Sequence, residues 1–262
     1  MGTNTSPGKQ SPVWLVISLT AAVIFWQIIA DYVVRNKFIL PSFTDTFAAL
    51  IQLWGGGTIW VDIWTSLMHF AIGLLLALAV GVPIGICIGW FERINKLLDP
   101  LIEIIRPIPP LAWIPFAIVW FGLTDFSAGF VIFIGSVFPI LINTYEGFRS
   151  VPRVFVEAGR MLGCTSSISL IRYIALPAAL PHLAAGFRIA SGVAWMCLVA
   201  AEMFGVSRFG LGQKIWWYYN LHQMDSVLVY MLLLGFIGLF IDYLFRYGID
   251  HSLLRWRVGE VN

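Results

Sequence analysis

Arg188 lies deep inside a long apolar segment, residues 183–204, where a charged side chain is unusual. An ionised group at the centre of a bilayer costs about 2.5–3.5 kcal/mol on insertion scales, so it normally faces protein, water or an opposite charge. At helical spacing, five more residues share its face: Ser191, Gly192, Trp195, Val199 and Glu202. We predict that this face lines a passage. Arg188 would supply a positive potential that favours a small anion, Trp195 would narrow the passage, and Glu202 would pair with a basic group or help to gate it. The alternative is a structural Arg188 that neutralises Asp242 or caps the carbonyl groups of a broken helix.

A second candidate element is the stretch RPIPPLAWIPFAIVWFG, residues 106–122. Its four prolines cannot all fit a regular helix, because each removes a backbone donor and clashes with the preceding turn. Broken helix in a membrane has to be buried in protein or face water. The sequence therefore predicts a kinked element that lines the same passage, with a packed structural kink as the alternative. The residues assigned to it are Arg106, Pro109, Pro110 and Trp113.

Residue types that support catalysis or metal binding are scattered along the chain. The histidines show neither an H-E-x-x-H motif nor another clustered ligand spacing, and no G-x-S-x-G motif is present. The phosphate-binding motif G-x-x-x-x-G-K-[ST] is also missing, so we expect no ATP to be bound in that manner by this chain. The three cysteines suggest no disulfide framework. We expect no catalytic residue, no metal site and no directly bound cofactor.

The composition indicates what kind of elements must position these residues. Hydrophobic residues make up 59% of the chain, charged residues 11%, and the mean hydropathy is +0.85. A soluble domain has about 45–50% apolar residues, so this is a membrane protein. A span needs about 20 apolar residues. Six segments qualify, although the third is short and proline-rich: 13–32, 63–90, 107–123, 128–145, 183–204 and 227–245. The predicted fold class is an all-α polytopic membrane protein with about six transmembrane helices.

The distribution of positive charge predicts the orientation. Of the 16 lysines and arginines, eleven fall on one side of the six-span arrangement and four on the other, with Arg188 within a span. Short cytoplasmic loops are enriched in Lys and Arg, so both termini are predicted to be cytoplasmic. Asp31 and Tyr32 stand where a signal peptide would have small residues at its cleavage site, so the first span is expected to remain as an anchor.

Three regions are predicted. Residues 1–62 contain the anchor and an amphipathic outer-surface helix, which Ser42 and Asp45 begin as a capping box and the glycines at 55–57 end. Residues 63–250 form the core, in which Gly81, Gly85 and Gly89 allow close helix packing. Residues 251–262 form a cytoplasmic tail.

The core includes a polar cytoplasmic loop, residues 149–181. Five of its residues form one apolar helical face: Val154, Phe155, Ala158, Met161 and Leu162. Gly163 should end this helix, and a second short helix should run to Leu176 before Pro177 and Pro181 break the chain. The apolar face either folds back on the bundle or docks into a groove of a cytosolic protein.

The loop contains E-A-G-x-x-x-G followed by I-A-L-P, which resembles the EAA signature of the membrane subunits of ABC importers. Gly159 stands where the signature usually has alanine, and the spacing from Gly163 to Ile174 is one residue longer than usual. The stretches at 106–122 and 176–205 are similar to the nitrate, taurine, alkanesulfonate and bicarbonate branch of these permeases. The resemblance implies that the loop receives the ATPase subunit. The coupling residues would be Arg153, Glu157, Ala158, Gly159, Arg160 and Gly163.

The resemblance also implies a function and a set of partners. The chain would be the permease subunit of a type I ABC importer in the plasma (inner) membrane, without an ATPase site of its own. Its partners would be a second copy of itself, cytosolic ATPase subunits that bind ATP and Mg, an extracytoplasmic solute-binding protein, and the lipid bilayer, with no nucleic acid. The expected substrate is a small anion imported by alternating access. The alternatives are a permease for an organic cation or vitamin precursor, and a membrane-embedded enzyme.

Overall fold

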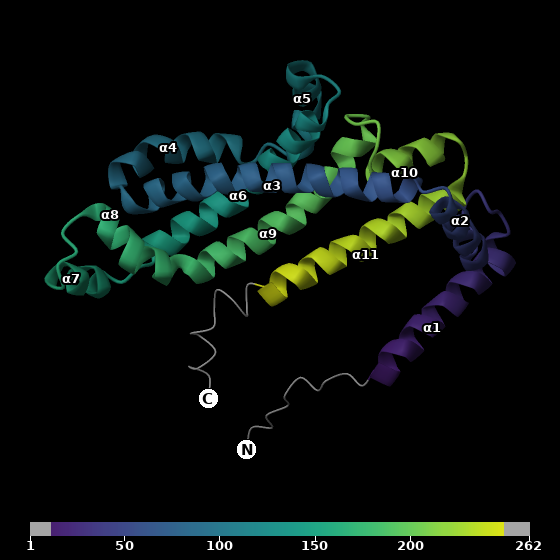
Figure 1. Cartoon of the computed structure of the whole chain (residues 1–262), viewed down its shortest axis with the longest axis horizontal. Coiled ribbons are helices and arrows are strands. Elements are labelled where there is room, and N and C mark those ends of the chain that lie inside the picture. Colours follow the sequence, from purple (N-terminus) through teal and green to yellow (C-terminus); the bar gives the residue numbers. More distant parts are fainter. Residues whose placement is uncertain (1–11, 249–262) are drawn as a thin grey trace. The chain divides into compact units, whose positions relative to one another are not determined.

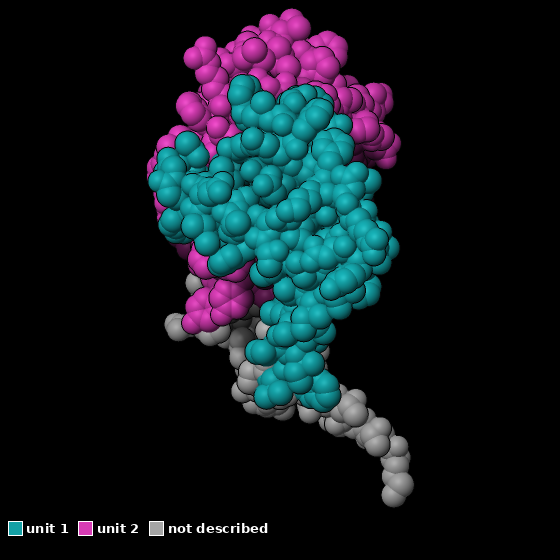
Figure 2. Space-filling model, turned by 90° about the vertical axis from the view of Figure 1, so that its right-hand side faces the viewer, with its two compact units in different colours: residues 1–59, 215–232 teal, residues 60–214, 233–262 magenta. Residues whose placement is uncertain are grey.

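The computed structural model describes residues 12–248, and every regular element in that range is a helix (Figure 1), which confirms the all-α fold class. Within this range, residues 12–59 and 215–232 form one compact unit, and residues 60–214 and 233–248 form the other (Figure 2). The sequence analysis placed a boundary after residue 62 and assigned residues 215–232 to the core region, whereas in the structure they belong to the same unit as the N-terminal segment. The predicted tail, residues 251–262, lies outside the described residues.

The first unit contains the predicted anchor and the amphipathic helix. Helix α1 (Pro12–Ile28) continues into a π-helical turn (Ile29–Val34), and α2 (Phe43–Gly55) begins at a capping box. The Ser42 hydroxyl accepts from the Asp45 backbone N–H at 3.2 Å and donates to the Asp45 carboxylate at 2.8 Å. The hydrogen bond from Lys37, and then that from Ser42, hold the pKa of Asp45 below its ordinary value. Asp45 therefore stabilises the unit above the ordinary carboxyl pKa, and this contribution is lost as pH falls through the lowered value.

The second unit is built on close packing of α3 (Thr58–Trp90) against α6 (Asp125–Arg149). A Cβ added at Gly81, Gly85 or Gly89 would lie 3.1, 2.6 or 2.7 Å from a side-chain atom of α6. The facing residues, Ile140, Thr144 and Phe148, repeat at the same four-residue interval. The glycine row therefore lets the two backbones approach closely, as predicted, since ordinary side-chain contacts need more than 3.4 Å.

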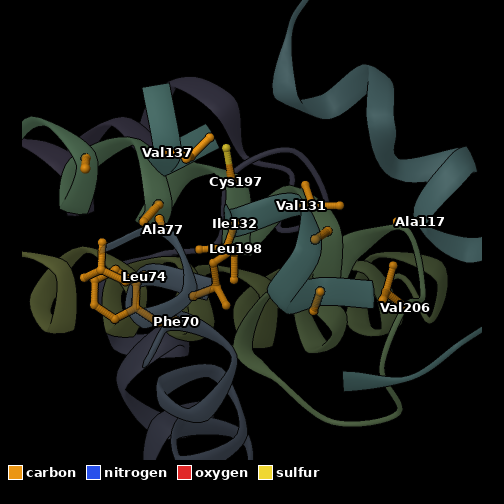
Figure 3. Packing of buried hydrophobic residues seen from close by; sticks show 14 of the residues in the cluster. Phe70, Leu74, Ala77, Ala117, Val131, Ile132, Val137, Cys197, Leu198 and Val206 are labelled. Carbon is orange, nitrogen blue, oxygen red and sulfur yellow. The ribbon is translucent and has the colours of Figure 1, made fainter. Parts of the chain in front are cut away.

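Helix α9 (Leu176–Met203) packs on a neighbouring face of α6 through a second set of small residues. Gly147 faces Ala179 and His182, and Gly186 faces Asn143. Apolar side chains from α3, α6 and α9 fill the core, and Figure 3 shows Phe70 and Leu74 of α3 close to Leu198 of α9. This three-helix core fixes the positions of the candidate site residues on α9.

The proline-rich stretch forms a sharp bend. Helix α4 (Glu92–Ile105) is followed by a 3-10 turn (Pro110–Trp113) and the short helix α5 (Ile114–Phe121), and the two arms meet at 86°. The kink predicted at this stretch is confirmed. The predicted third span, residues 107–123, is not one continuous helix, because its prolines prevent the regular hydrogen-bond ladder. Five helices in the described range are long and apolar enough to cross a membrane, or six if the bent pair counts as one span.

The predicted cytoplasmic loop contains the expected helix and turn. Helix α7 (Arg153–Met161) ends before Gly163, and the Ser166 hydroxyl caps α8 (Ser167–Leu170). The predicted break at Pro177 and Pro181 is wrong, because the chain stays helical from Ser167 to Met203. A π-helical turn (Ile171–Ala175), in which the Leu176 N–H bonds to the Ile171 carbonyl five residues back, takes up the irregularity ahead of Pro177. The remaining helices are α10 (Leu211–Asn220) and α11 (Met224–Gly248).

Candidate functional site

The apolar face of α7 is open on the surface of the second unit. The exposed fractions are 69% for Val154, 55% for Phe155, 90% for Met161 and 87% for Leu162, and Ala158 is also exposed. The alternative in which this face folds back on the bundle is therefore wrong for these side chains. The polar residues assigned to the same loop, Arg153, Glu157 and Arg160, are exposed as well. An exposed apolar stripe with charges beside it has the pattern of an amphipathic helix that docks into a groove.

Two glycines shape this stripe. Gly159 is buried, and a Cβ at this position would overlap the end of the Ile174 side chain and lie 3.3 Å from Leu170. The glycine in place of the usual alanine thus lets α7 pack tightly on the turn before α9. Gly163 has φ of +98°, a conformation that favours glycine, and its N–H bonds to the Arg160 carbonyl at 3.1 Å. The turn holds α7 in a fixed direction relative to α8.

A cavity of about 340 Å³ lies where the bend meets α6 and α9. Its lining includes Arg106 and Pro110 from the bend, Asn143 from α6, and Ile189 and Val193 from α9. Arg106 is the charged side chain among the lining residues. The bend and α9, which were predicted to line one passage, therefore contribute to one cavity. Pro109 is exposed beside it, and Trp113 is half-buried, with its ring 6.1 Å from that of Phe116.

The open face of α9 differs from the predicted one. The exposed positions Ala185, Ile189, Gly192 and Met196 repeat at steps of three and four, with Arg188, Val193 and Val199 half-buried around them. Ser191 is buried and donates to the Arg188 carbonyl at 2.8 Å. The Trp195 indole N–H donates to the Leu234 carbonyl at 3.2 Å, and its ring packs edge-on against Phe70. Trp195 thus contacts helices of its own chain, because the core of α3, α6 and α9 turns this side of α9 inward.

Glu202 is completely buried in a polar cluster that the sequence analysis did not predict. The Ser66 hydroxyl and the Gly212 backbone N–H each donate to its carboxylate at 2.8 Å, and His69 Nδ1 lies 2.9 Å from Glu202 Oε1. This partly agrees with the expectation that Glu202 pairs with a basic group. Asp62, Ser66 and His69 lie on α3 at steps of four and three, and this polar face within an apolar span is the signal that could have revealed the cluster.

No group of three or more His, Cys, Asp or Glu side chains suited to a metal ion occurs among residues 12–248. Of the four histidines, His69 belongs to the Glu202 cluster, while His251 lies outside the described residues.

Comparison with known proteins identifies the relatives of this chain. Residues 81–250 match the family described as "Binding-protein-dependent transport system inner membrane component". A putative ABC transporter permease protein of Methanocaldococcus jannaschii is 43% identical over 93% of this chain and 92% of its own length. The bicarbonate transport system permease protein CmpB of Synechococcus elongatus is 36% identical over 84% of this chain and 82% of its own. The nitrate import permease protein NrtB of Synechocystis is 33% identical, over 86% and 84%.

A solved structure shows the same fold at low sequence identity. An inward-facing structure of the MetNI methionine ABC transporter contains a chain that superposes with a TM-score of 0.65 at 19% identity. The similarity covers 77% of this chain and 96% of that chain. The helix arrangement is thus that of a type I ABC permease.

Proposed function

The chain belongs to the family of binding-protein-dependent transport system inner membrane components, and from this premise we propose that it imports a small anion. It would do so as the membrane subunit of an ATP-driven importer of the nitrate, bicarbonate, taurine or alkanesulfonate type, by alternating access. The observation that carries the proposal is its similarity over more than four fifths of the chain to permeases named for bicarbonate and for nitrate. Both of those substrates are small oxyanions.

The proposed assembly contains two copies of this chain, two ATPase subunits that bind ATP and Mg, and an external solute-binding protein. The exposed stripe on α7 supports the ATPase contact, because apolar side chains exposed by 55% to 90% need a partner surface. Closure of the ATPases would draw the two α7 loops together and turn the passage outward. Catalysis of ATP hydrolysis would then belong wholly to the partner.

The proposed orientation places the termini and the α7 loop in the cytoplasm, and α2 and the α9–α10 connection outside. We predict that single cysteines replacing Gln52 or Arg208 react with an impermeant maleimide in intact cells, and that a cysteine replacing Ser167 reacts only after lysis. All three positions are exposed, so reactivity should report the side of the membrane. The background should carry alanine in place of the native Cys87, Cys164 and Cys197, and labelling at Ser167 in intact cells would contradict the orientation.

The anion selectivity is proposed to depend on positive charge beside the open face of α9. Arg106 lines the cavity at the bend, and the half-buried Arg188 precedes the open position Ile189, so both can raise the local concentration of an anion. The cavity lining contains one aromatic residue, Phe138, which is too few for the aromatic cage that an organic cation would favour.

We expect Arg188→Gln to lower anion transport at least about tenfold, the effect of losing roughly 1.4 kcal/mol of charge attraction. Arg188→Lys, which keeps the charge, should stay within about threefold of the wild type. Transport is measured in proteoliposomes that contain the chain, its ATPase and its binding protein, with nitrate and bicarbonate as test substrates. Equal transport by the wild-type and Arg188→Gln proteins, with assembly and basal ATP hydrolysis unchanged, would assign Arg188 a structural role. Uptake of an organic cation instead of both anions would overturn the proposed substrate class.

A further inference from the structure

Glu202 lies at the end of α9, where it contacts the connection to α10 as well as α3. The Gly212 N–H donates to Glu202 Oε2, the Leu211 N–H donates to the Ser66 hydroxyl at 2.9 Å, and the Gly210 N–H donates to the Asp62 carboxylate at 3.3 Å. Three successive backbone donors are thus satisfied by side chains of α9 and α3. These bonds fix where α9 ends and α10 begins.

Two glycines, Gly210 and Gly212, allow the backbone to pass close to the Glu202 side chain. Gly210 has φ of +133°, and a Cβ there would lie 2.6 Å from the Glu202 carboxylate. A Cβ at Gly212 would lie 2.5 Å from the Val199 carbonyl oxygen and 3.0 Å from Glu202 Cβ. The backbone therefore wraps directly around the buried acid, and any side chain at either position would push it away.

His69 connects Glu202 to a second carboxylate. Its Nδ1 lies 2.9 Å from Glu202 Oε1, and its Nε2 lies 3.0 Å from Asp125 Oδ1. The Ser207 hydroxyl, in the same connection, donates to Asp125 Oδ1 at 3.2 Å. His69 and Glu202 are buried, whereas 69% of the Asp125 side chain is exposed. The hydrogen-bonded series from Glu202 through His69 to Asp125 thus leads from the buried core to the protein surface.

Counting protons shows what these contacts require. The Ser66 hydroxyl has one proton, and because its oxygen accepts from the Leu211 N–H, that proton points to Glu202. An ionised carboxylate only accepts hydrogen bonds. Hydrogen bonds between one imidazole and both carboxyl groups therefore need either a proton on each ring nitrogen, or a proton on Nε2 and a second proton on the Glu202 carboxyl group, which then donates to Nδ1. Either way, the three groups together hold one proton more than a neutral histidine beside two ionised acids.

We propose that Glu202 is a positioning residue that fastens the α9–α10 connection and the first turn of α10, residues 204–212, and that the additional proton on the His69 bridge is part of this anchor. The proton links the connection, through Asp125 and Ser207, to the start of α6. Loss of the proton would remove one of the two His69 bonds and loosen the connection. This inference concerns the subunit itself and goes beyond the proposed transport function.

The charges around His69 set the direction of the pH dependence. The groups on the elements packed around it are Asp62 on α3, Asp125 on α6 and Glu202 on α9, and the basic residues of the connection and α10 are Arg208, which is exposed, and Lys214, which is half-buried. Two carboxylates in contact with one histidine, with a third about two turns away on α3, favour retention of the proton. The anchor should therefore be complete at lower pH and weaken as pH rises.

The test is hydrogen exchange of the full-length protein in lipid nanodiscs, with rates corrected for the intrinsic effect of pH. Glu202→Gln should lower the protection factors of the 205–212 amides at least about tenfold, since the net contribution of a hydrogen bond to a charged group corresponds to more than a factor of about ten in an equilibrium constant. Glu103→Gln is the same change at an exposed glutamate of α4, and it should leave the protection of the 205–212 amides within about twofold of the wild-type value. Wild-type protection in Glu202→Gln would overturn the positioning role.

The proton is tested by the pH profile, which a purely structural contact would not change. Wild-type protection of the 205–212 amides should fall about tenfold between about pH 6 and pH 9, and His69→Gln should make the profile flat. A flat wild-type profile would overturn the proton bridge. If Glu202→Gln does not fold, Asp125→Asn serves instead, because its carboxylate is largely exposed. It should lower protection and flatten the profile, and a wild-type profile would overturn the proposal. None of these measurements depends on transport.

Discussion

Replacing Gly85 with leucine should lower the unfolding temperature of the protein markedly, whereas the same substitution at Gly235 should be tolerated. Even the first added carbon at Gly85 would lie 2.6 Å from Thr144 Cβ and 2.8 Å from the Leu141 carbonyl oxygen. The second obstacle is backbone, so α3 and α6 would have to separate. A Cβ at Gly235 on α11 meets nothing within 4 Å.

The expected cost at Gly85 is about 3 kcal/mol or more, the upper end for overpacking a close interface. For a chain of this size that corresponds to a fall of about 10 °C in the unfolding temperature. The measurement is the temperature at which each variant loses its monodisperse peak in size-exclusion chromatography. Gly85→Ala should give an intermediate loss, because it adds only the first carbon. Equal temperatures for Gly85→Leu and Gly235→Leu would mean that the glycine row does not hold α3 against α6.

Local patterns predicted the features of this fold that depend on neighbours in the sequence. Ser42 and Asp45 are three residues apart, and the capping box that they form needs nothing else. Gly163 lies at the end of an amphipathic pattern, where it was expected to end the helix, and its positive φ fits that position. The glycine row at 81, 85 and 89 predicted close packing because the spacing of four places the glycines on one side of a helix. These predictions are confirmed.

Features that depend on distant residues were missed or only partly predicted. His69 and Glu202 are 133 residues apart, so the sequence did not identify His69 as the basic partner that was expected for Glu202. The open face of α9 is centred on Ile189 and Gly192 because α9 packs against α6 as well as α3, which helical spacing alone does not show. Pro177 was expected to break the chain because proline interrupts a regular helix. The π-helical turn that accommodates it leaves no clear mark in the sequence. In each case tertiary packing decided between local alternatives.

Replacing Leu162 with glutamate should separate the chain from its ATPase, whereas Leu162→Met should not. The Leu162 side chain is 87% exposed and follows Met161, which is 90% exposed, at the end of the α7 stripe. Because the side chain makes little contact within its own chain, neither substitution should change the unfolding temperature of the subunit measurably. A charge buried at an apolar interface without a partner carries a large desolvation cost. Its effect should therefore appear only where a partner covers the stripe.

The expected loss for Leu162→Glu is at least about 100-fold in ATPase affinity, the size of an interface hot spot worth 2.7 kcal/mol or more. The measurement is copurification, followed by titration of the purified ATPase against the chain in nanodiscs. Leu162→Met keeps an apolar side chain of similar volume, so its affinity should stay within about threefold of the wild type. ATP-driven anion uptake should be lost in parallel with affinity. If Leu162→Glu keeps both wild-type affinity and uptake, the ATPase does not dock on this stripe. A loss of uptake with affinity intact would instead place Leu162 in the transmission of movement after docking, because binding and coupling would then depend on different parts of the loop.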